Sequence, residues 1–234
     1  MRSIYRTLRA DRALARDIAL VCVADAVVGL SFGAIAVSEG LPVWAPMLLS
    51  VVVFAGAAQF MFVGLVASGG NPVAAVLAGL LVNVRHVVFG FTVGDVVGRG
   101  WQRVVGSHVM VDETVAFALA QSDAARRRAA YWGCGIALFT CWNVGVVAGA
   151  SMGTAVSDPA VLGLDAAFPA VLLALVLPAL RDRTTALACG VGVVIALATA
   201  PFLQAGLPVL LALAGAVVAL ARPARPASQE EVPA

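Results

Sequence analysis

The stretch VAAVLAGLLVNVRHVVFGFTVG (73–94) decides the fold class of this chain. A transmembrane α-helix takes about 20 predominantly apolar residues, and this stretch has that length and character. Its centre nevertheless holds Asn83, Arg85 and His86. Ionisable side chains are costly in hydrocarbon and usually face a protein partner or a water-filled cavity. The stretch therefore predicts a membrane helix with a polar centre that faces the protein interior.

The composition of the whole chain agrees with a membrane protein. Of its 234 residues, 62% are hydrophobic and only 12% are charged. Soluble domains are near half apolar and a quarter charged. This chain has too few polar side chains to cover a soluble surface, so we predict an all-α, polytopic transmembrane helical bundle. The net charge of +2 gives no argument for nucleic-acid binding.

Eight apolar stretches are candidates for membrane-spanning helices. They cover residues 18–37, 43–67, 73–94, 104–121, 129–153, 165–180, 184–201 and 207–221. The fourth is interrupted by His108, Asp112 and Glu113, so a broken or re-entrant segment, or a total of seven spans, is an alternative. We divide the chain into a cytoplasmic Arg-rich arm (1–17), a transmembrane domain (18–221) and a disordered cytoplasmic tail (222–234).

The arginines predict the orientation of these spans, because cytoplasmic loops collect positive charge. With the N-terminus inside and eight crossings, twelve of the fifteen arginines lie in inside segments: Arg2, Arg6, Arg9, Arg12, Arg16, Arg126, Arg127, Arg128, Arg181, Arg183, Arg222 and Arg225. Arg99 and Arg103 would lie outside, and Arg85 within a span. This asymmetry predicts that both termini are cytoplasmic.

Glycines recur every four residues in three of the stretches. They are Gly29 and Gly33, then Gly90, Gly94 and Gly98, then Gly145, Gly149 and Gly153. Small residues at this spacing form a groove that lets another helix approach closely. Either a helix of the same chain or a second subunit could occupy each groove.

The isolated polar residues of the spans are candidates for function. Asp25 either reaches the headgroup region or is a buried carboxylate that binds an ammonium group or carries a proton, and the following Gly29, Ser31 and Gly33 could interrupt its helix. The amide of Gln59 could bind a zwitterion or another helix.

Arg85 needs a partner at membrane depth. It either forms an ion pair, for example with Asp25 or Glu113, or binds a substrate carboxylate. His86 could exchange a proton near neutral pH or remain a neutral, hydrogen-bonded side chain. Asp112 and Glu113 point about 100° apart on a helix, so we expect at most one of them to face a central cavity. An interfacial charge pair is the alternative.

No pattern in the sequence predicts an enzyme. It contains no nucleophile with a base at plausible spacing, no phosphate-binding loop and no metal-ligand spacing, so we expect no cofactor and no metal site. Cys22, Cys134, Cys141 and Cys189 lie inside apolar stretches without a CxxC pair, which is typical of small packing residues. Asp165 is expected to cap a helix.

Four motifs in order resemble the AzlC family, the large subunits of branched-chain amino acid exporters. They are VFAGAAQF (53–60), NVRHVVFG (83–90), DETVAFALA (112–120) and DPAVLGLDAAFPAVLLALVLPALRDR (158–183). The resemblance covers roughly residues 15–222. The family often has SAQF, LRH and GLDFAFPA where this chain has AAQF, VRH and GLDAAFPA, so the departures affect neighbours of the polar residues and not the polar residues themselves.

The resemblance implies a bacterial cell-membrane transporter that works with a small AzlD-like membrane subunit. Such pairs export valine, leucine, isoleucine and sometimes methionine, driven by the proton gradient or the membrane potential. We expect substrate binding at Asp25, Gln59, Asn83, Arg85 and Asp112, and proton coupling at His86 and Glu113. Phe54, Phe60, Val87 and Phe89 are expected to line the pocket for the apolar side chain. A transporter of another small solute, an importer and a non-transporting scaffold remain alternatives.

Overall fold

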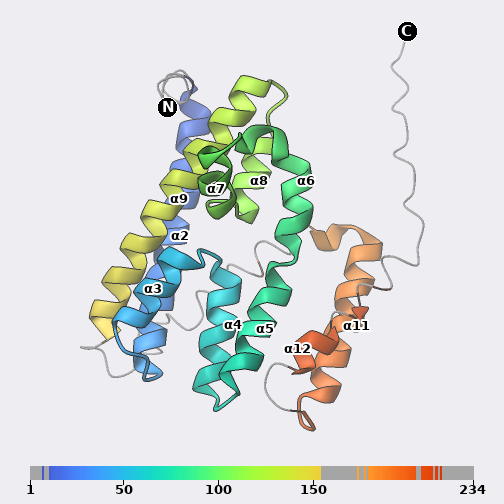
Figure 1. Ribbon diagram of the computed structural model, residues 1–234. Coiled ribbons are helices and arrows are strands. Elements are labelled where there is room, and N and C mark those ends of the chain that lie inside the picture. The colour runs from blue at the N-terminus through green and yellow to red at the C-terminus, as the bar shows by residue number, and fades with distance from the viewer. Residues whose placement is uncertain are drawn as a thin grey trace. The chain divides into compact units, whose positions relative to one another are not determined.

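The computed structural model describes residues 7, 11–153, 173, 177, 179–203, 207–212, 214, 215 and 217. The chain divides into two compact units, Met1–Leu172 and Leu173–Ala234, which are considered separately. The regular elements of the described residues are all helical, so the predicted all-α membrane fold is confirmed (Figure 1). Asp165, most of the stretch 165–180 and the tail 222–234 lie outside the described residues.

Two long antiparallel helices form the frame of the first unit. They are α2 (Arg12–Ser38) and α9 (Ala124–Gly153). A Cβ atom on Gly29 would lie 2.7 Å from the carbonyl oxygen of Trp142, so the two backbones approach closely here. The helix α2 is continuous, so the interruption that Gly29, Ser31 and Gly33 suggested in the sequence does not occur. Its glycines pack against α9 instead.

The stretch 43–67 is a hairpin of two short helices, α3 (Trp44–Val52) and α4 (Gly56–Ala67). The chain reverses at Phe54, whose φ of 41° is a backbone conformation that side chains other than glycine rarely adopt. The helix α3 starts beside the end of α2, and α4 ends at Ala67 and Ser68, which lie in one pocket with Glu39, the C-cap of α2. The hairpin therefore enters and leaves at the same end of the unit (Figure 1).

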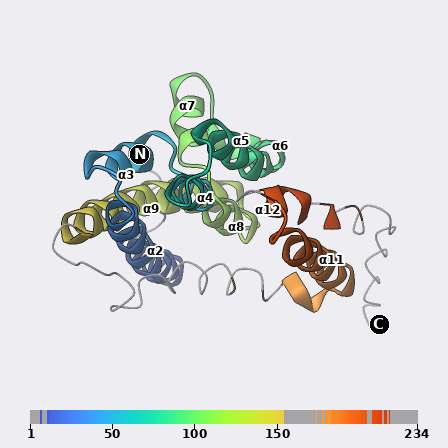
Figure 2. The same ribbon diagram turned by 90° about the horizontal axis from the view of Figure 1, so that it is seen from below.

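The stretch 73–94 forms two consecutive helices, α5 (Pro72–Asn83) and α6 (Arg85–Val97). Asn71 caps α5 through bonds from the backbone N–H groups of Val73 and Ala74, and Pro72 suits the first helical position. The two helices meet at Val84. Seen along the helices, α4 lies between the α2–α9 pair and α5 (Figure 2).

A second hairpin, α7 (Trp101–His108) and α8 (Asp112–Leu119), enters from the opposite end. The side chain of Arg128, near the start of α9, donates to Gln102 in α7, and Tyr131 donates to the carbonyl oxygen of Gly106. These contacts show that α7 runs inward along α9, and α8 returns to the start of α9. The stretch 104–121 is thus broken into a helical hairpin, as one of the sequence alternatives proposed.

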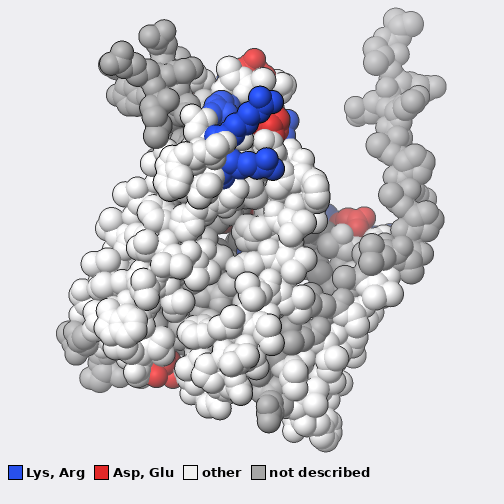
Figure 3. Space-filling view, viewed as in Figure 1, with Lys and Arg blue, Asp and Glu red and all other residues white. Residues whose placement is uncertain are grey.

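Three helical segments among the described residues are long and apolar enough to cross a membrane: Arg12–Ser38, Pro72–Val97 and Ala124–Gly153. Arginines gather at the end of the first unit where α9 begins (Figure 3). Because 43–67 is a hairpin, Arg99 and Arg103 follow a single further crossing and lie at this Arg-rich end. The eight-span scheme counted 43–67 as a crossing and so placed them at the end opposite Arg126, Arg127 and Arg128, and the structure contradicts that separation.

The second unit contains η2 (Ala179–Arg181), α11 (Arg183–Thr199) and α12 (Leu207–Ala212). Asp182 caps α11 by accepting bonds from the N–H and hydroxyl groups of Thr185, and these bonds lower the pKa of its carboxyl group. A Cβ atom on Gly192 would lie 2.8 Å from the carbonyl oxygen of Ala212, so α11 and α12 pack closely. The expected span 184–201 corresponds to α11.

Candidate functional site

The three helix breaks of the first unit meet in its interior. His108, at the end of α7, places its Nε2 2.8 Å from the carbonyl oxygen of Val51 in α3, and its ring centroid lies 6.3 Å from that of Phe54. The tips of the two opposed hairpins therefore touch. The break between α5 and α6 joins them, because Arg85 of α6 pairs with Asp112 of α8.

A charged cluster surrounds this meeting point. Arg85 Nη2 lies 3.0 Å from Asp112 Oδ2, and the two side chains are 37% and 35% exposed. Glu113 interacts electrostatically with both Arg85 and Asp25. Among the described residues, these contacts join one guanidinium to three carboxylates. The ion pair expected for Arg85 exists, but its partner is Asp112 and not Asp25 or Glu113.

Buried polar atoms accompany the cluster. Both Nε2 and Oε1 of Gln59, the Oδ1 of Asn83 and the Nε of Arg85 have no hydrogen-bond partner among the described residues. The side chain of Gln59 is only 1% exposed. A buried polar group without a partner costs about 1–3 kcal/mol, so these atoms are positioned to gain from binding a polar ligand.

The N-terminus of α4 also points to this region. Its N-cap residue, Ala55, provides no side-chain hydrogen bond to the first-turn N–H groups of the helix. Such N–H groups and the helix dipole attract anions. Gln59 lies in the first turn of α4, and helical side chains lean toward the N-terminus. The first turn of α8 holds Asp112 and Glu113, whereas the first turn of α4 holds no acidic side chain.

His86 and the residues expected to line an apolar pocket differ in burial and do not share one location. His86 Nδ1 lies 3.0 Å from the carbonyl oxygen of Asn83, across the break, and its ring packs against Phe89 at a centroid distance of 5.7 Å. Phe54 is buried at the hairpin tip and packs against Phe139. Val87 is 60% exposed, so the expectation that it lines a pocket was wrong.

The repeated glycines separate into three groups. Gly29, Gly33, Gly145, Gly149 and Gly153 lie where α2 and α9 pack backbone against backbone. Gly90 and Gly94 in α6 have nothing within 4 Å of the position of an added Cβ atom. Gly98 has a φ of 95° and ends α6, so it belongs to a turn and not to the groove.

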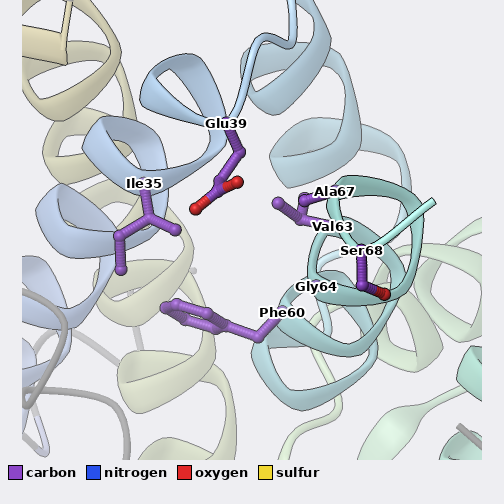
Figure 4. A pocket seen from close by; sticks show the side chains of 7 residues that line it. All are labelled: Ile35, Glu39, Phe60, Val63, Gly64, Ala67 and Ser68. Carbon is purple, nitrogen blue, oxygen red and sulfur yellow. The ribbon is translucent and has the colours of Figure 1, made fainter. Parts of the chain in front are cut away.

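A pocket at the end opposite the arginines was missed by the sequence analysis. It has a volume of about 310 Å³ and lies between the end of α2 and one face of α4 (Figure 4). Its lining residues are Ile35, Glu39, Phe60, Val63, Gly64, Ala67 and Ser68. No local sequence pattern brings Glu39 beside α4.

No three His, Cys, Asp or Glu side chains of the described residues lie close enough to hold a metal ion. The arrangement offers a guanidinium, an open helix N-terminus, carboxylates and unpartnered amides at the depth where the helices break. Discontinuous helices of this kind bind small charged solutes in membrane transporters.

Comparison with known proteins places these features in a family context. The family model described as AzlC protein matches residues 20–156, which include both hairpins and all three breaks. The chain is 30% identical over 161 residues to the inner membrane protein YgaZ of Escherichia coli (strain K12), covering 65% of this chain and 62% of that protein. It is 28% identical over 89 residues to an uncharacterized membrane protein of Helicobacter pylori, covering 38% of this chain and 39% of that protein. The aligned segments thus span less than two thirds of these relatives. No solved structure matches.

Proposed function

This chain belongs to the AzlC family, and from that membership we propose that it is a transporter subunit that exports branched-chain amino acids across the inner membrane of a bacterium. The proposed substrates are valine, leucine and isoleucine, with methionine as a further substrate. The family and the membrane proteins among its relatives support a transporter-type protein and not an enzyme.

The observation that carries this proposal is the polar centre where three broken helices meet. A branched-chain amino acid has a carboxylate, an ammonium group and an apolar side chain. Arg85 or the open N-terminus of α4 would bind the carboxylate. The carboxylates of Asp25, Asp112 and Glu113 outnumber Arg85, so they would bind the ammonium group. Gln59 and Asn83 would gain hydrogen bonds that they lack among the described residues.

The excess of carboxylates also supports coupling to protons or to the membrane potential. Two carboxylates without a cation are expensive at membrane depth unless they bind a proton or a cationic group. Asp25 and Glu113 interact electrostatically and lie on different helices, so a proton on either would change the electrostatic interaction between α2 and α8. His86, beside the break at Val84, is the second candidate for proton exchange.

The open face of α6 is the proposed surface for a small AzlD-like partner. Gly90 and Gly94 leave space along this helix, and Phe91 between them is 87% exposed. A helix of the partner could approach the glycines closely and cover Phe91. The glycines of α2 and α9, by contrast, already pack against the backbone of the other helix.

Two alternatives make different predictions. A transporter or importer of another small zwitterion would use the same polar centre, but external labelled leucine would then not exchange with internal leucine in membrane vesicles. A non-transporting scaffold would tolerate changes at Arg85 or Asp112 that preserve folding, whereas it would lose function when Gly94 is replaced by a bulky residue.

Efflux from dipeptide-fed cells tests the proposal. Cells without their own exporters receive a leucine-containing dipeptide, and internal and external free leucine are followed over minutes. Efflux should rise when this chain and its partner are expressed together. Unchanged efflux with both chains folded in the membrane would reject branched-chain export.

The matched variants compare two ion pairs of one chain. Asp112→Asn should abolish most of the efflux, because it removes the partner of Arg85 in the centre. Asp95→Asn is the control, since Asp95 is 58% exposed, and its partner Arg127, at 3.5 Å, also donates to the carbonyl oxygen of Thr92. Exposed pairs are worth about 0–1 kcal/mol, so the control should keep wild-type efflux and membrane level.

A further inference from the structure

The pocket between α2 and α4 holds a carboxylate and an aromatic ring that are not part of the central site. Glu39 directs its carboxylate into the space between the two helices, and the ring of Phe60 lies on the opposite side of that space (Figure 4). Ile35, Val63 and Ala67 provide apolar walls. No ion pair of Glu39 appears among the described residues. The volume of the pocket, about 310 Å³, lies at the lower end of the range for small-molecule sites, about 300–1,000 Å³.

This lining selects for one kind of group. A carboxylate opposite an aromatic face attracts a cation by a charge-assisted bond and by the ring quadrupole. The group must be small and must carry an apolar part, because the walls are aliphatic. An anion would meet Glu39 without a compensating cation in the lining.

The location of the pocket connects it to the centre. Its inner wall, Phe60, lies next to Gln59 in α4 and packs edge-on against Phe32 at a centroid distance of 5.2 Å. Phe32 in turn stacks on Trp142 at 6.0 Å. The pocket opens at the end opposite the arginines, which the orientation rule assigns to the outside.

We propose that this pocket is an outer vestibule that binds the ammonium group of a small aliphatic amine or amino acid through Glu39, with Phe60 as the wall toward the centre. The direction of transport and the identity of the substrate rest on the proposed function, whereas the recognition of an aliphatic ammonium group rests on the pocket itself.

Direct binding to the full-length chain in lipid nanodiscs tests the proposal. The probes are L-leucine, 3-methylbutylamine, which lacks the carboxylate, and 4-methylpentanoate, which lacks the amine. Calorimetric titration should detect both amines and no 4-methylpentanoate at this pocket. Glu39→Gln should weaken binding of 3-methylbutylamine about tenfold, the effect of losing one charge-assisted hydrogen bond.

A second variant fills the pocket without altering charge. A Cβ atom on Gly64 would meet nothing within 4 Å, so Gly64→Leu is compatible with the backbone and places a side chain in the cavity. It should abolish amine binding. Gly190→Leu is the matched control, because Gly190 is also a helical glycine with open space around it. Asp95→Asn is the control for the loss of a carboxylate.

The central carboxylates provide the decisive comparison. Because the central carboxylates can also bind an ammonium group, the proposal expects Asp112→Asn to retain the part of 3-methylbutylamine binding that Glu39→Gln weakens. The reverse pattern would overturn it, because the amine would then bind at the centre, and an absence of amine binding by the wild-type chain would overturn it as well. If amine binding depends on Glu39 but leucine efflux is absent, the proposed export function is rejected and the proposed binding pocket is supported. If efflux occurs but Glu39→Gln and Gly64→Leu bind the amine normally, the pocket proposal fails alone.

Discussion

The α2–α9 pair and the centre formed by the three helix breaks use the same apolar environment in opposite ways. In the pair, glycines bring the two backbones into direct contact. In the centre, side-chain atoms of Gln59, Asn83 and Arg85 lack hydrogen-bond partners among the described residues, and four ionisable side chains gather there. We therefore expect the first region to be rigid and propose that the second binds the solute.

The difference teaches where a membrane protein places the polar groups it needs. An unbroken helix satisfies its own backbone hydrogen bonds, so it can be buried against another helix or lipid. A broken helix exposes N–H and C=O groups, which are tolerated only where protein or water surrounds them. The two hairpins create such surroundings by meeting tip to tip at His108 and Val51.

The largest expected effect tests the packed region. Gly149→Val would place a side chain against the backbone carbonyl of Leu30, and that atom cannot move without shifting α2. We expect a loss of about 3 kcal/mol or more in the free energy of unfolding and little protein in the membrane. Gly94→Val, in open space on α6, should keep the chain folded. Thermal unfolding of both purified variants measures the contrast, and equal stability would refute the assignment of rigidity to the α2–α9 pair.

The second prediction separates folding from function in the centre. Asp112→Leu leaves Arg85 without its partner, and because the pair is partly exposed we expect a cost of about 2 kcal/mol, less than for a fully buried pair. The double variant Arg85→Leu with Asp112→Leu should recover the membrane level but not the efflux. Western blots of membranes and dipeptide-fed efflux give the two readouts. Recovered efflux in the double variant would show that the pair is only structural.

The third prediction concerns the contact between the hairpin tips. His108→Phe keeps an aromatic ring against Phe54 but removes the hydrogen bond to Val51. The expected loss is about 1 kcal/mol in the free energy of unfolding, typical of one hydrogen bond. Hydrogen exchange of residues 51–55 and 109–111 should rise in the variant and remain unchanged at 26–30. Uniform changes in all three segments would contradict a local role.

The smallest effect lies outside the membrane, where α2 begins. Asp11 accepts a bond from the N–H of Leu14 and pairs with Arg126 of α9, and these contacts hold the pKa of Asp11 below its ordinary value of 3.8. Because the folded-state pKa is lowered, the stabilisation is complete above the ordinary value and is lost as the pH falls through the folded-state value. Asp11→Asn should flatten the dependence of Tm on pH below about pH 4. If the dependence of Tm on pH is unchanged in this variant, Asp11 does not contribute to the stability of the α2–α9 contact.

The sequence predicted the long helices because length and hydropathy are local properties. The segment 18–37 became α2, and 129–153 lies within α9. The break at 53–55 could not be predicted, since residues 43–67 carry no charged side chain, are predominantly apolar and are long enough to cross a membrane. In the structure, the positive φ of Phe54 marks the reversal. The second hairpin was foreseen as an alternative, because His108 and Asp112 interrupt its hydropathy.

The polar residues of the centre were found for the same reason, since each is a local anomaly in an apolar stretch. Their pairing was not found. Asp112 and Glu113 are neighbours in sequence, and only the position of α8 decides which of them bonds to Arg85. The pocket at Glu39 was missed because a carboxylate at a helix end is ordinary in a sequence. Its role appears only when α4 returns beside it.

The most direct test of this account is the sidedness of the first hairpin. Single cysteines are placed at exposed positions by Pro42→Cys before α3, Ser68→Cys after α4, and Arg99→Cys and Ser122→Cys around the second hairpin, in a chain whose four native cysteines are replaced by alanine. A membrane-impermeant maleimide is applied to intact cells. The account predicts that the cysteines at 42 and 68 are labelled from outside, and those at 99 and 122 only after the cells are opened. Labelling at 42 and 68 from opposite sides would mean that residues 43–67 cross the membrane, and it would contradict the meeting of re-entrant hairpins on which the proposed site depends.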